Sequence, residues 1–182
     1  MFQFWESGFE GSSMQNLVDR MGISRQSLYD TYGNKRELFE ASLKIYRKEV
    51  IEPKLAELAD TSRSPTELIR NHLTSIAEGC NEMPVGCLMV RTATELPVDD
   101  AEIGEIINDC VMLSWQAVRR VIERGQASGE FDSGRSADDL AGCVITSAMG
   151  MNVMRRLPGH GQAIRPSVES LIAGLQGRRV EH

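Results

Sequence analysis

The sequence has few of the cysteine patterns that mark secreted or zinc-binding proteins. Its four cysteines are widely spaced: Cys80, Cys87, Cys110 and Cys143. They form no Cys-x-x-Cys pair and no Cys/His pair at zinc-ligand spacing. We therefore expect buried free thiols, because free cysteine is among the most buried residue types, and no metal site.

Long apolar runs are also missing. No run approaches the roughly 20 residues that a transmembrane helix needs, and the amino-terminal segment has neither the basic nor the apolar region of a signal peptide. The six prolines and 16 glycines are scattered without a period, which excludes collagen-like and low-complexity chains. These absences predict a soluble, cytoplasmic protein without a membrane segment.

The usual catalytic constellations are absent as well. The chain has no recognisable Ser/His/Asp set, phosphate-binding loop or paired catalytic carboxylates. His72 stands alone, and a lone histidine is more often structural than catalytic. We expect neither enzymatic activity nor a cofactor.

What the chain does have is an uneven charge distribution. The total formal charge is -6, but residues 1–48 hold seven basic and six acidic side chains, a net charge of +1. The remainder therefore carries -7. This asymmetry favours an amino-terminal part that meets phosphate and a carboxy-terminal part with another role.

Apolar residues recur at spacings of three and four along most of the sequence, which predicts an all-α fold. Helix-starting signals include Ser12 with Gln15, Asn34 with Glu37, and Ser64 followed by Pro65. The expected helices cover about 2–9, 12–21, 24–32, 34–52, 64–77, 86–96, a long segment between 100 and 125, 136–157 and 165–177.

Residues 12–35 are the most informative stretch. Two short helices, with Gly22 at the left-handed position between them, precede a third helix capped by Asn34. This arrangement is typical of a DNA-reading helix-turn-helix. The same spacing also suits a plain three-helix bundle with a polar face. We expect Leu28, Thr31 and Tyr32 to lie inward, and Met14, Leu17, Val18 and Met21 to form the buried stripe of the preceding helix.

The opposite face of the helix that begins after Ser24 carries groups suited to DNA. Arginine matches the guanine edge and glutamine the adenine edge, whereas hydroxyl and ammonium groups suit phosphate. The expected DNA-binding residues are Ser13, Ser24, Arg25, Gln26, Ser27, Tyr29, Tyr32 and Lys35.

The same stretch resembles the TetR/AcrR family of bacterial transcriptional regulators. The resemblance rests on Gly8-Phe9, Ser12-Ser13, Gly22-Ile23-Ser24, Leu28-Tyr29, Tyr32, Lys35 and Leu38-Phe39, and covers about residues 4–46. Gly86-Cys87-Leu88 also resembles a segment seen in many members. The helix at 2–9 is shorter than usual for the family: either this chain starts late or upstream residues are missing from it.

The resemblance implies a helix-turn-helix DNA-binding domain at 1–46 and a larger helical domain at 47–182 that binds a small molecule and dimerises. Small residues recur in the last two expected helices and favour a homodimer through them. They are Ala137, Ala141, Gly142, Ser147, Ala148 and Gly150 in 136–157, and Ala173 and Gly174 in 165–177. The expected function is a repressor released from operator DNA by a small hydrophobic inducer.

Several residues of the expected carboxy-terminal domain suit an apolar ligand. The candidates are His72, Met89, Met112, Trp115 and Met149, although such methionines and tryptophans are more often simply core and a lone histidine is more often structural. Two alternatives stay open: a thiol-based redox or electrophile sensor that uses Cys87 with Arg91 as its positive neighbour, and an all-helical interaction protein that binds no DNA. We also expect the helix that begins at Lys35 to couple the two domains.

Overall fold

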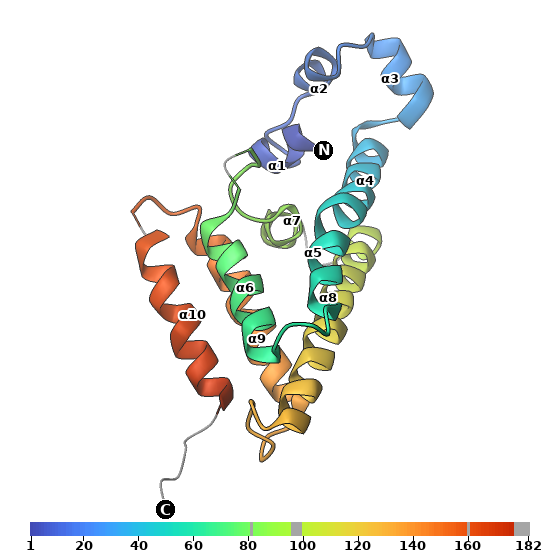
Figure 1. The fold of residues 1–182 in the computed structure, drawn as a ribbon. Helices are drawn as coiled ribbons and strands as arrows, with labels where there is room; N and C mark the ends of the chain where they lie inside the picture. The colour runs from blue at the N-terminus through green and yellow to red at the C-terminus, as the bar shows by residue number, and fades with distance from the viewer. Residues whose placement is uncertain (81, 96–99, 160, 177–182) are drawn as a thin grey trace, which may run out of the picture. The chain divides into compact units, whose positions relative to one another are not determined.

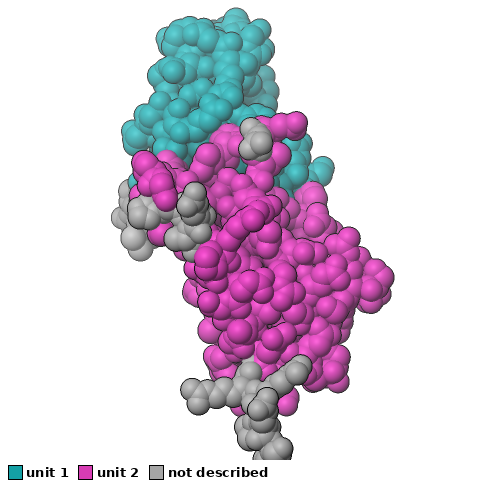
Figure 2. All heavy atoms as spheres, turned by 60° about the vertical axis from the view of Figure 1, so that its left-hand side comes forward, with its two compact units in different colours: residues 1–52, 87–110 teal, residues 53–86, 111–182 magenta. Residues whose placement is uncertain are grey.

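The computed structural model describes residues 1–80, 82–95, 100–159 and 161–176, and every regular element in them is helical. The all-α expectation is confirmed. Figure 1 shows the helices in chain order, and Figure 2 colours the two compact units into which the chain divides. Unit 1 comprises residues 1–52 and 87–110, and unit 2 comprises residues 53–86 and 111–182. The units therefore do not follow the single division at residues 46 and 47, which stays a prediction for the functional domains.

Unit 1 contains the helix-turn-helix and the helix segments that support it. Its elements are α1 (Phe2–Ser7), α2 (Met14–Met21), α3 (Arg25–Tyr32), α4 (Lys35–Tyr46), the π-helical turn η1 (Arg47–Ile51), α7 (Leu88–Glu95) and the first part of α8 (Ala101–Ser128). Phe4, Leu28, Phe39 and Leu43 are at most 1% exposed and form its core. The Phe4 ring meets the Phe39 ring edge-on at 4.9 Å, a preferred aromatic geometry.

The sequence predicts one continuous helix from Lys35 to about Glu52, but the α-helix does not continue unchanged over this range. It ends at Tyr46, and a wider π-helical turn, η1, leads into α5 (Glu52–Ala56). Pro53 is the second residue of α5 and has no N–H, so it cannot donate to the carbonyl of Glu49 as an α-helix requires. A π-helical turn is one way for a helix to pass such a position.

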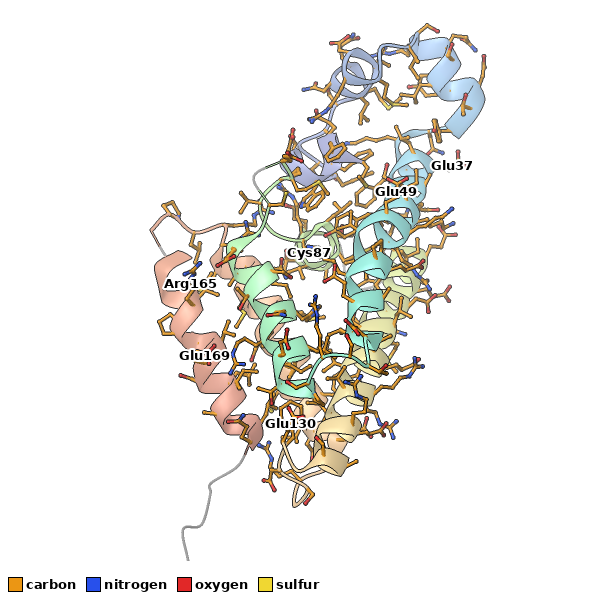
Figure 3. The ribbon with its side chains drawn as sticks, in the orientation of Figure 1. Glu37, Glu49, Cys87, Glu130, Arg165 and Glu169 are labelled. Atoms are coloured by element: carbon orange, nitrogen blue, oxygen red, sulfur yellow. The ribbon has the colours of Figure 1, made fainter. Side chains whose placement is uncertain are left out.

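Unit 2 is a helical bundle. After the 3-10 turn η2 (Glu57–Ala59), α6 (Pro65–Glu78) packs against both α9 (Ala137–Met154) and α10 (Gly161–Gln176). Ion pairs between Arg70 and Glu169 (2.9 Å) and between Glu78 and Arg165 join α6 to α10 (Figure 3). Fully buried aliphatic and aromatic side chains fill the interior: Leu68, Ile69, Leu73, Val118, Ile122, Phe131, Leu140 and Ile172.

The helix ends in unit 2 follow the local sequence closely. Ser64 caps α6 by accepting from the N–H of Glu67, with Pro65 at the first helical position. The long helix α8 extends to Ser128, three residues beyond the expected end at Gly125. Glycine is required at position 125 because the Phe131 ring packs against it. A Cβ there would lie 2.1 Å from the Phe131 ring. Pro97–Asp99 of the expected turn lie outside the described residues.

Candidate nucleic-acid interface

The turn between α2 and α3 has the geometry expected of a helix-turn-helix. Gly22 has φ 65° and ψ 28°, the left-handed conformation that glycine adopts without strain, and its N–H donates to the Val18 carbonyl. Ser24 then caps α3 by accepting from the N–H of Ser27 at 3.0 Å. These contacts are local, so the turn forms where the sequence predicts it.

The start of α2 corrects one expectation. Ser13, not Ser12, caps the helix by accepting from the N–H of Asn16 at 3.1 Å. Ser12 is fully buried and donates instead to the Gly8 carbonyl at 2.6 Å. The two serines are indistinguishable in the local pattern, and the contact with the end of α1 decides between them.

The recognition helix α3 buries a narrow face. Leu28 is fully buried and Tyr32 is partly buried, whereas Thr31 is exposed. The expectation that Thr31 lies inward is therefore wrong. On α2, Leu17 is buried but Met21 is 40% exposed, so Met21 does not belong to the buried stripe either. Two short helices leave room for one central apolar contact row, and residues at its edge face solvent.

The exposed face of α3 carries the groups expected to meet bases. Arg25, Gln26, Tyr29 and Asp30 are all exposed. Within the described part of the chain, Arg25 takes part in no ion pair. The Gln26 side-chain amide donates to a carboxylate oxygen of Asp30 at 2.7 Å. The sequence interpretation did not single out Asp30 as a site residue, although its position four residues after Gln26 gives the signal.

The hydroxyl and ammonium groups expected at phosphates surround this face. Ser24 and Ser27 are exposed and their hydroxyls lie 2.9 Å apart. Tyr29 is 42% exposed, and Ser13 at the start of α2 is exposed. The Lys35 ammonium lies over the Phe9 ring, 4.4 Å from its centroid, in a cation–π contact. Their role towards DNA stays a prediction.

Two arginines hold α4 and α1 to residues far along the chain: Arg36, which the sequence interpretation did not place, and Arg91, which it placed only as a neighbour of Cys87. Arg36 in α4 contacts Glu40 at 2.9 Å and Asp100 at 2.6 Å. Arg91 in α7 donates to the Glu6 carbonyl at 2.7 Å, at the end of α1, and lies 2.6 Å from Glu95. Within unit 1, the helices on either side of the helix-turn-helix, α1 and α4, are thus held by contacts between residues more than 60 positions apart.

The placement of Arg91 corrects the expectation that it supplies a positive field to Cys87. Its guanidinium is occupied by the carbonyl end of α1 and by Glu95. Cys87 is partly buried and its thiol contacts the phenol of Tyr46 instead. Burial, and to a lesser extent this contact, raises the pKa of Tyr46. Burial also raises the pKa of Cys110 to about 11. The Cys87 label in Figure 3 marks this region.

The expected pocket residues lie on four helices and in both units. Met89 on α7 is buried in unit 1. In unit 2, His72 on α6 and Met149 on α9 are partly buried, Met112 on α8 is 46% exposed, and Trp115 on α8 donates to Asp138 at 3.3 Å. Their role in ligand binding is therefore still a prediction. Among the described residues, no group of three or more His, Cys, Asp or Glu is arranged to hold a metal ion.

Helices α9 and α10 expose small residues. Gly150 and Gly174 are exposed, and a Cβ at either position would meet no atom within 4 Å. Packing inside this chain therefore does not explain these glycines. Gly142 differs, because a Cβ there would lie 3.0 Å from the Trp115 ring. No helix in the described ranges is both long enough and apolar enough to cross a membrane.

An all-helical chain with a capped helix-turn-helix and a separate helical bundle defines a class: the helix-turn-helix transcriptional regulators. Family comparison identifies the branch. Residues 2–42 match the family described as "Bacterial regulatory proteins, tetR family", and residues 66–171 match the "Tetracyclin repressor-like, C-terminal domain". The chain belongs to the TetR family of transcriptional regulators.

Individual relatives agree with this assignment. The uncharacterized HTH-type transcriptional regulator YezE of Bacillus subtilis (strain 168) is 36% identical over 136 residues, which cover 70% of this chain and 68% of YezE. The HTH-type transcriptional repressor ComR of Escherichia coli (strain K12) is 25% identical over 155 residues, 84% of this chain and 74% of ComR.

A solved structure shows the same fold in a protein bound to DNA. It is a cysteine mutant of the TetR family regulator CifR complexed with 26-base-pair double-strand operator DNA, with a TM-score of 0.80 and 25% identity. The similarity covers 94% of this chain and 90% of that chain. Resemblance between these chains thus extends well beyond the helix-turn-helix.

Proposed function

We propose that this protein is a homodimeric repressor that binds operator DNA through α3 and leaves it when a small hydrophobic molecule binds the helical regulatory part. The observation that carries the DNA-binding step is the exposed face of α3. It presents an arginine that forms no ion pair with any described residue, and a glutamine, at the amino end of a capped helix and opposite the buried Leu28. That end of the recognition helix contacts base edges in helix-turn-helix proteins.

The relatives support the direction of regulation. ComR of E. coli and DhaR of Mycobacterium sp. (strain GP1) are both named transcriptional repressors, and the latter is 24% identical over 149 residues. Family members of this kind act as dimers with an effector site in the carboxy-terminal domain. The two exposed glycines on α9 and α10 favour that assembly, because they allow a second chain to approach closely.

Selection of bound genomic fragments, followed by footprinting, tests the DNA-binding step. A footprint with two half-sites is expected, and affinity should fall steeply with salt because phosphate contacts release counterions. If the protein selects no fragment, the DNA-binding step is contradicted, and the alternative of an interaction protein without DNA binding is favoured. For the dimer, Gly150→Leu and Gly174→Leu should shift the protein towards monomer in analytical ultracentrifugation. Gly104→Leu is the control, since Gly104 is exposed with equally open surroundings on α8.

A thiol sensor on the same scaffold is the second candidate. The contact between Cys87 and the buried Tyr46 favours it, because Tyr46 packs edge-on against Trp5 of α1 at 4.7 Å. A bulky adduct on Cys87 would displace Tyr46 and with it α1, which contacts α2 of the helix-turn-helix. The discriminating experiment is release of the footprinted DNA by an electrophile, compared between the wild type and Cys87→Ser.

A further inference from the structure

A carboxylate lies at the centre of the surface proposed to face DNA. At 100° per residue along α3, Gln26 and Asp30 project close together and roughly opposite Leu28. Leu28 is fully buried, and both Gln26 and Asp30 are exposed. Because each DNA phosphate is negative, an acidic group here weakens the attraction between α3 and any duplex. Its presence therefore needs a compensating interaction.

The protein itself does not neutralise this carboxylate. Within the described residues, Asp30 forms no ion pair, and the contact that holds it is the 2.7 Å hydrogen bond from the Gln26 amide. Some acidic groups of unit 1 do have arginine partners: Glu6 pairs with Arg20, and Asp100 with Arg36. The second carboxylate oxygen of Asp30 is thus available towards solvent, or towards a bound duplex.

The chemistry of a carboxylate selects its partner in the major groove. An ionised carboxylate only accepts hydrogen bonds. Guanine presents two acceptors and thymine an acceptor and a methyl group, whereas cytosine presents its N4 amino donor. Adenine also has an amino donor, but its N7 acceptor lies beside it and would repel the carboxylate. Cytosine is therefore the base that Asp30 fits.

Building on the proposed function, we propose that Asp30 is a specificity-determining residue that accepts a hydrogen bond from the N4 amino group of one cytosine in each operator half-site. Its hydrogen bond with Gln26 fixes the orientation of the glutamine amide. The remaining amide N–H and the amide oxygen then face outward as a donor and an acceptor, the pair that matches adenine. Gln26 and Asp30 together read two neighbouring base pairs, and Asp30 penalises sequences that lack the cytosine.

The chain offers a matched control for this carboxylate. On α2, the Gln15 amide donates to Asp19 at 2.7 Å, the same contact at the same four-residue spacing. Asp19 is also exposed. Asp19→Asn and Asp30→Asn therefore remove the same charge from the same kind of pair on adjacent helices. Both positions are exposed, so neither substitution disturbs the core.

The experiment measures affinities of the full chain for the footprinted operator and for random duplex DNA at one salt concentration. The Asp30→Asn variant should bind random DNA more tightly than the wild type, since a negative charge is lost. Its affinity for the operator should be unchanged or lower. The ratio of the two affinities should fall at least about fivefold, because an asparagine whose single oxygen accepts from Gln26 presents only an NH2 donor to the cytosine amino group. Asp19→Asn should leave the ratio unchanged. Equal gains on operator and random DNA for Asp30→Asn would overturn the inference.

An atomic test uses operators in which single cytosines are replaced by 2-pyrimidinone, which lacks the N4 amino group. At one position per half-site, the wild type should lose about fivefold or more in affinity, whereas Asp30→Asn should lose nothing further. If no replacement distinguishes the two proteins, Asp30 does not read cytosine, although operator binding itself stands. A wild type that selects no operator would overturn the proposed function, and this inference with it.

Discussion

Arg36 and Asp100 form a two-point ion pair across 64 residues of sequence, with Nη1–Oδ2 and Nη2–Oδ1 both 2.6 Å apart. Asp100 also accepts from the N–H of Ile103 in the first turn of α8 at 3.2 Å. The guanidinium beside it holds the pKa of this carboxyl below its ordinary value. Because α4 begins three residues after α3 ends, the pair links the support of the recognition helix directly to the start of α8.

Asp100→Asn should loosen both ends of this link. We expect faster amide hydrogen exchange in the first turns of α4 and α8, since the amide cannot replace a charge-assisted, bidentate contact. Glu102→Gln is the control, because Glu102 is 76% exposed and its distance to Arg36, 3.4 Å, is longer than that of Asp100. If both variants exchange alike, the pair does not fix these helices. The pKa of Asp100 is lowered by folding, so its contribution persists above the ordinary aspartate pKa near 3.8 and is lost in more acidic solution.

Arg25→Ala and Gln26→Ala should each reduce the discrimination between operator and random DNA by roughly 1–3 kcal/mol, as expected for a lost base contact. Lys35→Ala should instead weaken binding to all duplexes and flatten the salt dependence by about one unit. Fluorescence anisotropy over a salt series separates these outcomes. Equal losses for Arg25→Ala on operator and random DNA would remove Arg25 from the base-reading group.

Gly8→Ala should destabilise the protein by more than about 1 kcal/mol, because the left-handed backbone disfavours alanine and the new Cβ collides with neighbours. Gly8 has φ 75°, and a Cβ would lie 2.9 Å from Arg91. Gly22→Ala tests a positive φ in open surroundings; its ψ of 28° is left-handed helical, whereas the ψ of 179° at Gly8 belongs to a region that essentially only glycine adopts, which adds to the loss at Gly8. Urea denaturation should show the larger loss for Gly8→Ala. Equal losses would mean that α7 yields to the added methyl group.

His72 should make stability depend on pH. Burial, with a smaller effect of Lys54, lowers its pKa to about 4. An unfolded histidine binds a proton near pH 6.5, so stability falls as the pH is lowered from 7 to 5, by up to about 2 kcal/mol. His72→Phe should lack this part of the loss. Denaturant midpoints at both pH values measure it, and parallel losses in the two proteins would contradict the prediction.

Cys87→Ser should retain operator binding, because a hydroxyl can still contact Tyr46. If Cys87 is the sensing group, the variant loses its release of DNA by an electrophile such as N-ethylmaleimide. Cys80→Ser is the control, since Cys80 is exposed and lies in unit 2. An unchanged dose response of Cys87→Ser would end the thiol interpretation and leave the small-molecule inducer as the signal.

The sequence by itself determined the elements that depend on local chemistry. Ser24, Asn34 and Ser64 each accept from a backbone N–H three residues on, as their positions before apolar periodic segments predict. Gly22 adopts the left-handed turn because that conformation is a property of the residue. These local signals, with the resemblance of residues 4–46, were sufficient for the all-helical class and the helix-turn-helix.

Only the tertiary structure decided which side chains those elements bring together. In the folded chain Ser13, and not Ser12, caps α2, and Thr31 and Met21 are exposed. Arg91 contacts the end of α1 and not Cys87. The tertiary structure also pairs Arg36 with Asp100. Such choices depend on which distant helix supplies a carbonyl, a carboxylate or an apolar surface. Contacts between residues 64 or 85 positions apart follow from packing, and the local periodicity of a helix contains no information about its distant partner.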